Sequence, residues 1–485
     1  MRRTITIAAV LFLTASLANA DDALRNQAAA ALRKGTEFFR NKVATEGGYL
    51  WQYSDDLTRR EGEGRAADSD VWVQPPGTPS VGLALLEAYQ NTGDKYYLDG
   101  ARQAGYCLVR GQRESGGWNY RIRFKPAHRK QTAYRVDSKP DAKKNEKRKD
   151  NVSTLDDNTT QEALRLLMRL DKTLDFKDKR IHEAALYTLR RLLDVQYPNG
   201  AWPQRFTAPP RTDKFPVKKA SYQKKWSWEF PRKSYSSHYT FNDNTICDTL
   251  DVMLEAARIY GDQKYRQAAL RCGEFILLAQ MPLPQPAWAQ QYDAHMHPAW
   301  ARKFEPPSIT GGESQGVMRT LLRLYKETGE DRFLDAVGPA LTYFEGSLLP
   351  CGNLARFYEL KTNRPLYFTK KYKLTYVNNK DDIPTHYSFV VGHGLPKIRR
   401  EYQRLLKIQA AGGPKPKKQS KKSSPPSKAM IAQVKAVIAA QDEQGRWLQN
   451  GKLKRFGADD PTRRVIKCDT FIRNTRILSR YLARE

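Results

Sequence analysis

Apolar residues recur along most of the chain at the three- and four-residue spacing of amphipathic helices, and the helical phrases repeat. In each phrase an apolar helix stops at a glycine and is followed by a turn and a second helix. Three such phrases run over Leu86–Gly93, Leu254–Gly261 and Leu322–Gly329. Repeated helix pairs favour a ring or a solenoid of helix hairpins. We favour the ring, which buries its inner helices without terminal caps, and predict an all-α fold: an incomplete to complete α/α toroid with long functional loops on one face.

A glutamine, a turn and a tryptophan follow the second helix of several repeats. The glutamines Gln112, Gln196 and Gln280 are equally spaced along the chain, and they precede Trp118, Trp202 and Trp288. A further copy joins Gln441 to Trp447. A spacing this regular indicates repeat architecture rather than chemistry.

Composition divides the chain into four predicted segments. Residues 1–20 begin with two arginines, continue with an apolar run and end at a small-residue cleavage site, which is the layout of a signal peptide; an uncleaved anchor is the alternative. Residues 21–405 hold the toroid, and 406–429 form a linker rich in Pro, Ser and Lys. Residues 430–485 form a helical half-repeat that packs on the toroid, or else a separate module. We expect a secreted or periplasmic protein whose mature part has no membrane span.

The charge of the chain narrows the class of partner. It has 83 Lys and Arg residues against 52 Asp and Glu residues, a net charge of +31. Such a field attracts polyanions, including nucleic acids, anionic lipids and acidic polysaccharides. Secretion argues against nucleic acid as the physiological partner. We expect a monomer that meets an acidic polysaccharide.

Acidic and amide residues gather at the starts of two helices, at corresponding points of successive repeats. Asp156, Asp157 and Asn158 open one helix, and Asp243 and Asn244 open the other. A single Asp or Asn per helix is explained by N-capping. Two or three in a row exceed what capping requires, and oxygen ligands gathered in one place suit Ca²⁺. On spacing alone, capping and metal binding both remain open.

Two later stretches mix aromatic and charged residues where the repeat would have only turns. One runs from Trp288 to Ser314, and the other contains Arg356, Arg364 and Lys370. Aromatic faces beside cations are what a groove for acidic sugars needs. A solvated basic face is the alternative interpretation.

Several motifs occur together in the order of a known family. They are Gly200–Gln204, Thr240–Asn244, Ala289–Asp293, Pro298–Arg302, Pro307–Ser314 and Arg356–Glu359. Over roughly residues 150–375 the chain resembles polysaccharide lyase family 10, the pectic acid lyases. The resemblance implies an α/α toroid, Ca²⁺ as cofactor and anti-β-elimination on polygalacturonate (pectate).

The resemblance also implies residue roles. Arg302 is implied as the catalytic base, and Asp156 and Asp243 as catalytic and metal-binding carboxylates, although Asp157 competes with Asp156 for the equivalent position. Arg356 is implied to bind a substrate carboxylate. The other implied substrate-binding residues are Asp157, Asn158, Asn244, Asp293, Trp300, Tyr358, Arg364 and Lys370.

The chain departs from the family pattern at two places. Asp156-Asp157-Asn158 stands where the family has Asp-Asn-Asp or Asp-Asn-Gly, and Lys370 stands near a family arginine. A lysine keeps the charge but loses the planar fork that grips a carboxylate.

Two other classes fit parts of the pattern. A non-catalytic toroid that only holds pectin or another polyanion shares the basic groove. A terpenoid-cyclase-like toroid shares the Gln-Trp repeats, but it needs an acidic Asp-x-Asp-Asp cluster that the sequence lacks.

Overall fold

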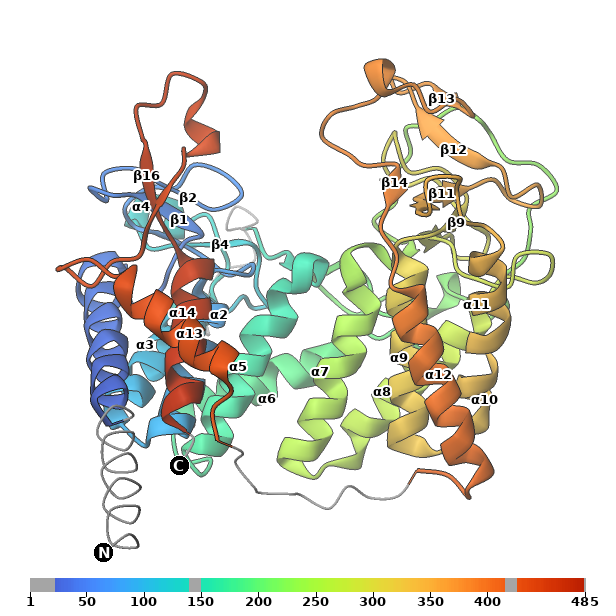
Figure 1. Cartoon of the computed structure of the whole chain (residues 1–485). Helices are drawn as coiled ribbons and strands as arrows, with labels where there is room; N and C mark the ends of the chain where they lie inside the picture. Colours follow the sequence, from blue (N-terminus) through green and yellow to red (C-terminus); the bar gives the residue numbers. More distant parts are fainter. Residues whose placement is uncertain (1–21, 139–149, 415–424, 484–485) are drawn as a thin grey trace, which may run out of the picture.

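The structure is a computed structural model that describes residues 22–138, 150–414 and 425–483. The predicted signal peptide and the central part of the predicted linker lie outside the described residues. Helix hairpins stand side by side in an arc, and two clusters of loops and short strands rise above the same side of the helices (Figure 1). The predicted all-α toroid is confirmed.

The helices form two rows. Members of the inner row pack against one another in a fixed order: α14 (Cys468–Leu482), α2 (Thr78–Thr92), α5 (Thr159–Thr173), α7 (Thr245–Tyr260), α9 (Glu313–Thr328) and α12 (Leu395–Ala410). The outer row holds helix 22–38, α3 (Lys95–Gly111), α6 (Lys179–Asp194), α8 (Gln263–Leu278), α10 (Asp331–Asp335), α11 (Val337–Glu345) and α13 (Lys428–Ala439). A short helix, α4 (Pro126–Arg129), lies in a loop.

The predicted stop signals end three inner helices. Gly93, Gly261 and Gly329 follow α2, α7 and α9 with φ of 73°, 72° and 74°. This left-handed conformation is open to glycine because it has no Cβ. Asp94 and Asp262 then cap the next helices through hydrogen bonds from the backbone N–H of Tyr96 and Lys264.

Short antiparallel strands close each unit of the array. A strand leading into an inner helix pairs with a strand that follows an outer helix. The pairs are β3 (Asp70–Trp72) with β4 (Arg121–Arg123), β5 (Ser153–Thr154) with β6 (Arg205–Phe206), β7 (Tyr239–Thr240) with β8 (Gln291–Tyr292), β9 (Ile309–Thr310) with β11 (Phe357–Tyr358), and β16 (Arg464–Lys467) with β1 (Gln52–Ser54). The sequence did not predict these strands, because two to four residues are too short for an alternating pattern to be visible.

Two of these pairs grow into four-stranded sheets, one above each end of the arc. The orders are β15-β16-β1-β2 and β13-β12-β11-β9, and β10 pairs separately with β14. The added strands are β2 (Arg60–Glu61), β10 (Leu354–Ala355), β12 (Pro365–Phe368), β13 (Leu374–Thr375), β14 (Val390–Val391) and β15 (Leu448–Asn450). We name the loop cluster with β1, β2, β4, β15 and β16 the first lobe, and the one with β9 and β11 to β14 the second lobe (Figure 1).

The Gln-Trp repeats tie each unit to the next. The side-chain amides of Gln112, Gln196 and Gln280 donate to Ala184 O, Ala268 O and Ala336 O in the next outer helix, at 2.8, 2.9 and 2.8 Å. The tryptophan indoles donate to carbonyls of their own outer helices. These residues are therefore architectural.

The same bond places the C-terminal half-repeat. Gln441 donates to Ala31 O at 3.0 Å, so α13 precedes helix 22–38 in the array, and α14 packs against α2. In Figure 1, α12 and α13 lie at opposite ends of the arc although they are consecutive in the chain, so the toroid is incomplete. Because α12 continues to Ala410 and α13 begins at Lys428, the linker is shorter at both ends than the predicted 406–429.

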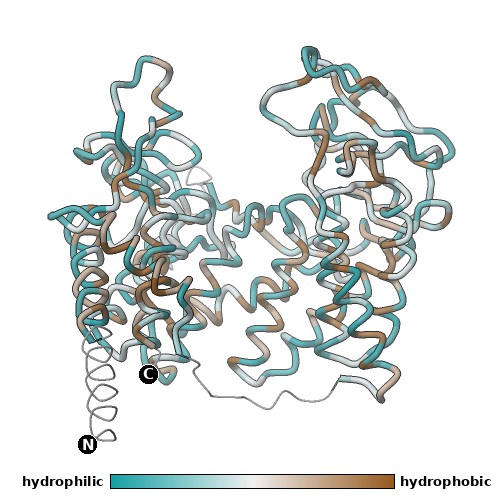
Figure 2. Tube along the Cα trace, viewed as in Figure 1, coloured by the Kyte–Doolittle hydropathy of each residue, from teal (hydrophilic) through white to brown (hydrophobic). Residues whose placement is uncertain are grey.

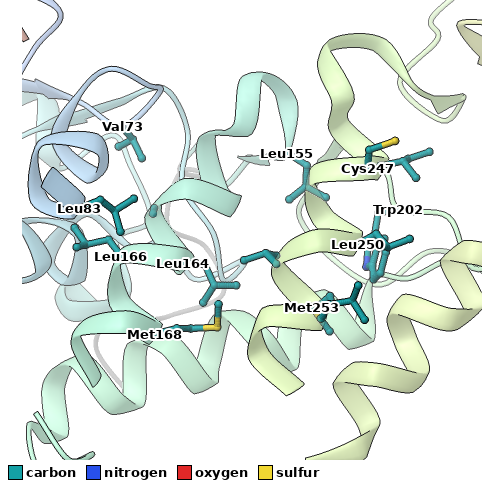
Figure 3. Close-up of a cluster of buried hydrophobic side chains, with 14 of the residues drawn as sticks. Val73, Leu83, Leu155, Leu164, Leu166, Met168, Trp202, Cys247, Leu250 and Met253 are labelled. Carbon is teal, nitrogen blue, oxygen red and sulfur yellow. The ribbon is translucent and has the colours of Figure 1, made fainter. Parts of the chain in front are cut away.

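The core lies between the two helix rows. Leu164 and Met168 of α5 and Leu250 and Met253 of α7 are fully buried and gather in one cluster (Figure 3). Each fully buried side chain of this size contributes roughly 1.5–3 kcal/mol. Hydrophobic positions recur along the helices, whereas the loops above them are largely hydrophilic (Figure 2). This packing holds the starts of α5 and α7 beside each other. Within the described residues, no helix is both long and apolar enough to cross a membrane.

Candidate active site

The same unusual turn begins α5 and α7. A one-turn helix precedes each, η3 (Asp156–Asn158) before α5 and η5 (Asn242–Asn244) before α7. Asp157 and Asp243 have φ of 51° and 48°, and the asparagine after each has φ of 57°. Two successive left-handed residues that are not glycine are costly, by about 1–2 kcal/mol each. The repeated strain shows that Asp157 corresponds to Asp243, whereas Asp156 corresponds to Asn242.

The two turns bring three carboxylates together. Oxygen atoms of Asp156, Asp157 and Asp243 all lie within 4.8 Å of one another. The structure therefore joins the two predicted metal ligands, Asp156 and Asp243, and adds Asp157, which the resemblance had implied only for substrate binding.

The donor set of this cluster fits Ca²⁺. Asp156 Oδ1 and Asn158 Oδ1 are buried and have no hydrogen-bond partner among the described residues. Ca²⁺ takes six to eight oxygen ligands at about 2.3–2.6 Å, so ligand oxygens around one ion lie within about 5 Å of one another. Three carboxylates, an unpartnered amide oxygen and water satisfy that requirement.

The electrostatics of the cluster also favour a cation. Burial and the neighbouring charges of Asp156 and Asp243 raise the pKa of Asp157 to about 7. Burial and the charges of Asp156 and Glu313 raise the pKa of Asp243 to about 6. Neighbouring carboxylates resist ionisation because their negative charges repel one another. A cation bound between them removes this repulsion and stabilises the ionised form.

Residues from the first lobe and from β6 hold the aspartates. Gln74 Nε2 donates to Asp157 Oδ2 at 2.8 Å, and Tyr120 Oη donates to Asp156 Oδ2 at 2.8 Å. Arg205 Nη2 lies 3.9 Å from the same oxygen of Asp156. Sequence reasoning missed Gln74 and Tyr120, because neither lies in a recognised motif or at the start of a helix.

Arg302 reaches the cluster from the loop between β8 and β9. Its positive charge lowers the pKa of both Asp157 and Asp243. Its Nε and Nη2 donate to the two carboxylate oxygens of Glu305 at 2.8 and 2.6 Å, and 41% of its side chain is exposed. Burial works to lower the pKa of Arg302, but the hydrogen bonds and charge of Glu305 outweigh it and raise that pKa. Nη1 of Arg302 has no hydrogen bond among the described residues.

A buried amide links Arg302 to the second turn. Gln290 Nε2 donates to Asn242 Oδ1 at 2.9 Å and to Glu305 Oε1 at 2.6 Å. Glu305 is only 2% exposed, so its ion pair with Arg302 is shielded from water on that side. The sequence placed Gln290 and Glu305 inside the recognised stretches without assigning them roles; the structure makes them the support of Arg302.

Arg356 stands over the start of α9, the next inner helix. Its Nη1 lies 3.4 Å from Glu313 Oε1, and its Nε donates to Ser388 O at 2.6 Å. Its guanidinium lies over the ring of Tyr387, 4.5 Å from the centroid. Tyr387 also donates to Glu305 Oε1 at 3.3 Å and lies under the guanidinium of Arg302, so Arg356 belongs to the same site.

A cationic cavity of about 670 Å³ opens beside Arg302. We name it the second-lobe cavity; its cations are Arg205, Arg232, Lys233, Arg302 and Lys303. Its size is that of a small-ligand site, and its charge suits an anionic ligand.

Two of the residues predicted to contact substrate have buried side chains. Tyr358 is 1% exposed, and its hydroxyl donates to Ser347 O and accepts from Ala355 N. Trp300 is 8% exposed, and its indole donates to Ser227 O. Both residues organise the second lobe from within, and sequence cannot tell an aromatic residue in a core from one in a sugar groove.

The remaining predicted residues lie at the periphery. Asp293 accepts the backbone N–H of His295 and His297 and thereby shapes its own turn. Arg364 stacks on Tyr376, 3.3 Å from the ring centroid. Lys370 is exposed, and within the described part of the chain no interaction joins it or Arg364 to the aspartates.

Comparisons with known proteins agree with the motif-based resemblance. Residues 125–350 match the family model described as pectic acid lyase. A family 10 polysaccharide lyase from Cellvibrio cellulosa is 21% identical, with 65% of this chain and 97% of that one covered and a TM-score of 0.43. A mutant of that lyase in complex with trigalacturonic acid is 20% identical, with 66% and 98% covered and a TM-score of 0.44.

A more distant solved structure, an unsaturated glucuronyl hydrolase specific for heparin, is 11% identical, with 95% and 97% covered and a TM-score of 0.41. No curated protein matches the chain. The family match over residues 125–350 confirms the resemblance to the pectic acid lyases. It supports a polysaccharide-acting lyase and, within that class, a pectate lyase.

Proposed function

We propose that the protein is an exported pectate lyase that cleaves α-1,4-polygalacturonate by Ca²⁺-assisted anti-β-elimination. The observation that carries the proposal is the three-aspartate cluster with Arg302 beside it. The trigalacturonic acid complex of the Cellvibrio cellulosa relative supports a galacturonate substrate. The net charge of +31 suits a polyanionic chain.

Each part of the site takes a share of the chemistry. Asp156, Asp157 and Asp243 would hold Ca²⁺, with Asn158 Oδ1 as a further oxygen ligand. Ca²⁺ bound there supplies positive charge that stabilises the carboxylate next to the reacting carbon as negative charge develops. Arg356 binds a substrate carboxylate and orients the sugar ring.

Arg302 first loses one guanidinium proton to solvent at alkaline pH. It then takes the proton from C5 and returns to its charged form, while the bond from C4 to the glycosidic oxygen breaks on the opposite face of the ring. The electron pair left on C5 forms the C4–C5 double bond, and the freed oxygen leaves with the remaining chain. Nη1 of Arg302 is without a hydrogen bond among the described residues, which leaves it available toward the cavity. The ion pair with Glu305 keeps the resting guanidinium protonated, so activity should rise steeply at alkaline pH.

Absorbance of the unsaturated uronate product tests the proposal. Polygalacturonate at alkaline pH should give a rising signal with Ca²⁺ and none after EGTA. Arg302→Ala should abolish the rise while it spares much of the substrate affinity, because the loss falls on the proton transfer. The exposed variant Arg332→Ala, on an outer helix, serves as the matched control. A flat trace from the wild-type protein with pectate binding intact would instead identify a non-catalytic pectin-binding toroid.

Export is a separate part of the proposal. Its support is the signal-peptide layout of residues 1–20. Expression of the full chain followed by N-terminal sequencing of the mature protein tests it. A mature protein that begins at Asp21 is expected, and an intact Met1 in the cytosolic fraction would contradict export.

A further inference from the structure

A second cationic cavity lies beside the aspartates, and Tyr120, which donates to Asp156, is part of its wall. It has a volume of about 450 Å³ and is lined by the arginines Arg113, Arg121, Arg123 and Arg455 together with Tyr120 and Glu63. We name it the first-lobe cavity. Its four arginines all lie outside the residues that match the family model.

One residue from the wall of each cavity approaches the same atom of the cluster. Tyr120 lines the first-lobe cavity, Arg205 lines the second-lobe cavity, and both side chains approach Asp156 Oδ2, at 2.8 and 3.9 Å. Glu63, in the wall of the first-lobe cavity, also acts on the pKa of Asp157. A chain-like ligand that crosses the aspartates can therefore enter both cavities.

Two of the four arginines are already neutralised, and two are not. Arg113 pairs with Asp150 at 2.8 Å, and Arg121 pairs with Asp70 at 3.3 Å and lies over Trp72. The guanidinium groups of Arg123 and Arg455 have no hydrogen bond or ion pair among the described residues. The charge of Arg123 is one of the causes that lower the pKa of Asp150. Glu63 is the other carboxylate in the wall. Among the described residues, two of the arginine forks in the cavity are therefore without a partner and can bind an anion.

The backbone of Arg455 is held in place, although its guanidinium has no hydrogen bond or ion pair among the described residues. Arg455 lies in a one-turn helix, η7 (Lys454–Phe456), between β15 and β16. The backbone N–H groups of Lys454 and Arg455 donate to the buried carboxylate of Glu61 at 3.2 and 2.8 Å. Arg65 donates to Arg455 O at 2.6 Å and to Phe456 O at 3.2 Å. A well-anchored backbone that carries an unpaired guanidinium is what carboxylate recognition needs.

We infer that the first-lobe cavity binds carboxylates of the polygalacturonate chain through Arg123 and Arg455. The inference rests on the proposed function for the identity of the anion. It gives the C-terminal half-repeat a role in substrate binding, because Arg455 comes from that segment. Arginine suits the task, since its planar fork binds a carboxylate with two hydrogen bonds.

Calorimetric titration with hexagalacturonate in EGTA, and initial rates with polygalacturonate in Ca²⁺, test the inference. Arg455→Gln and Arg123→Gln should each lower the affinity for hexagalacturonate about tenfold, which is the value of one charge-assisted contact. The double variant should raise KM for polygalacturonate by more than either single variant. The control is Arg332→Gln with Arg404→Gln, which removes the same charge from α10 and α12, outside both cavities.

The two proposals fail in different ways. No unsaturated product from the wild-type protein would defeat the proposed function, and the titration would still report on the cavity. Equal affinities of the double variant and its charge-matched control would overturn the inference, whether or not the protein cleaves pectate. If the double variant does not fold, Arg455→Gln alone decides, because that side chain is exposed and no hydrogen bond or ion pair joins it to another described residue.

Discussion

The turns before α5 and α7 have the same backbone and differ in one residue. Each puts two consecutive residues in the left-handed conformation and presents an aspartate at the first of them, Asp157 or Asp243. The residue before it is Asp156 in one turn and Asn242 in the other. The two turns therefore have the same backbone geometry but differ by one negative charge.

Because Asp156 and Asn242 differ, the two turns make different contacts. Asp156 faces the first lobe through Tyr120 and leaves one carboxylate oxygen without a partner. Asn242 instead receives a hydrogen bond from Gln290, which also holds Glu305 and so connects this turn to Arg302. The first turn supplies charge for a cation, and the second turn couples the cation site to the candidate base.

The largest expected effect follows from removing the charge that the two turns share. Asp157→Asn and Asp243→Asn should each lower kcat/KM on polygalacturonate by roughly a hundredfold or more, because a lost metal ligand removes charge stabilisation worth several kcal/mol. Initial rates across a Ca²⁺ titration measure this. Asp99→Asn, on the exposed face of α3, is the control. A normal rate in either variant would remove that residue from the cation site.

A smaller effect is expected when the first turn is made like the second. Asp156→Asn turns Asp-Asp-Asn into the Asn-Asp-Asn of the other repeat, and it keeps an oxygen that can accept from Tyr120. One carboxylate is lost but the geometry stays, so we expect a loss of about tenfold in Ca²⁺ affinity, in the range of changes around a metal site. Calorimetric titration with Ca²⁺ measures it. If Asp156→Asn lowers the Ca²⁺ affinity as much as Asp157→Asn does, the two turns do not differ in function as described.

The comparison of the two turns also shows which features of the fold and the site could be predicted from the sequence. The runs of Asp and Asn at two helix starts were visible because they exceed what capping needs, and the glycine stops predicted where α2, α7 and α9 end. Gln74 and Tyr120 were not visible, because they reach the aspartates from loops whose position depends on strand pairs of two or three residues. The burial of Tyr358 and Trp300 was not visible either, because burial depends on packing, which local sequence does not show.

The pH dependence of Ca²⁺ stabilisation tests the shared electrostatics. Folding raises the pKa of Asp157 to about 7 and that of Asp243 to about 6, above the value of about 3.9 in an unfolded chain. Between pH 4 and 7 the folded protein therefore binds more protons than the unfolded chain, and the free energy of unfolding without metal falls as pH rises. Ca²⁺ competes with those protons, so the rise in Tm that it causes should be larger at pH 8 than at pH 5, by a few degrees.

Thermal unfolding with Ca²⁺ and with EGTA at the two pH values measures this difference. The double variant Asp157→Asn with Asp243→Asn should lose the pH dependence along with most of the Ca²⁺ effect. Mg²⁺ at the same concentration is the cation control, because it demands a smaller and more regular ligand shell. An equal rise in Tm at both pH values would show that neither carboxylate titrates on folding as described.

The smallest expected effects come from the second left-handed residue of each turn, Asn158 or Asn244. Replacing either with alanine should cost about 1 kcal/mol, because asparagine adopts a φ of 57° more readily than alanine, which lacks the short polar side chain that stabilises this conformation. Glycine adopts this φ without strain, so Asn244→Gly should be nearly neutral, since no hydrogen bond of its side chain is found among the described residues. Asn158 differs: its Nδ2 donates to Glu162 at 3.2 Å, and its buried Oδ1 is without a partner.

Asn158→Gly should therefore cost about 1 kcal/mol that Asn244→Gly does not, and it alone should weaken Ca²⁺ binding. Denaturant unfolding with and without Ca²⁺ measures both the loss of stability and the loss of Ca²⁺ binding. If the two glycine variants behave alike, both asparagines serve only the backbone of the turn, and the cation site consists of the three aspartates. If Asn158→Gly alone is stabilised less by Ca²⁺, the first turn supplies an amide ligand as well as the extra carboxylate, and the asymmetry between the two turns extends to a second residue.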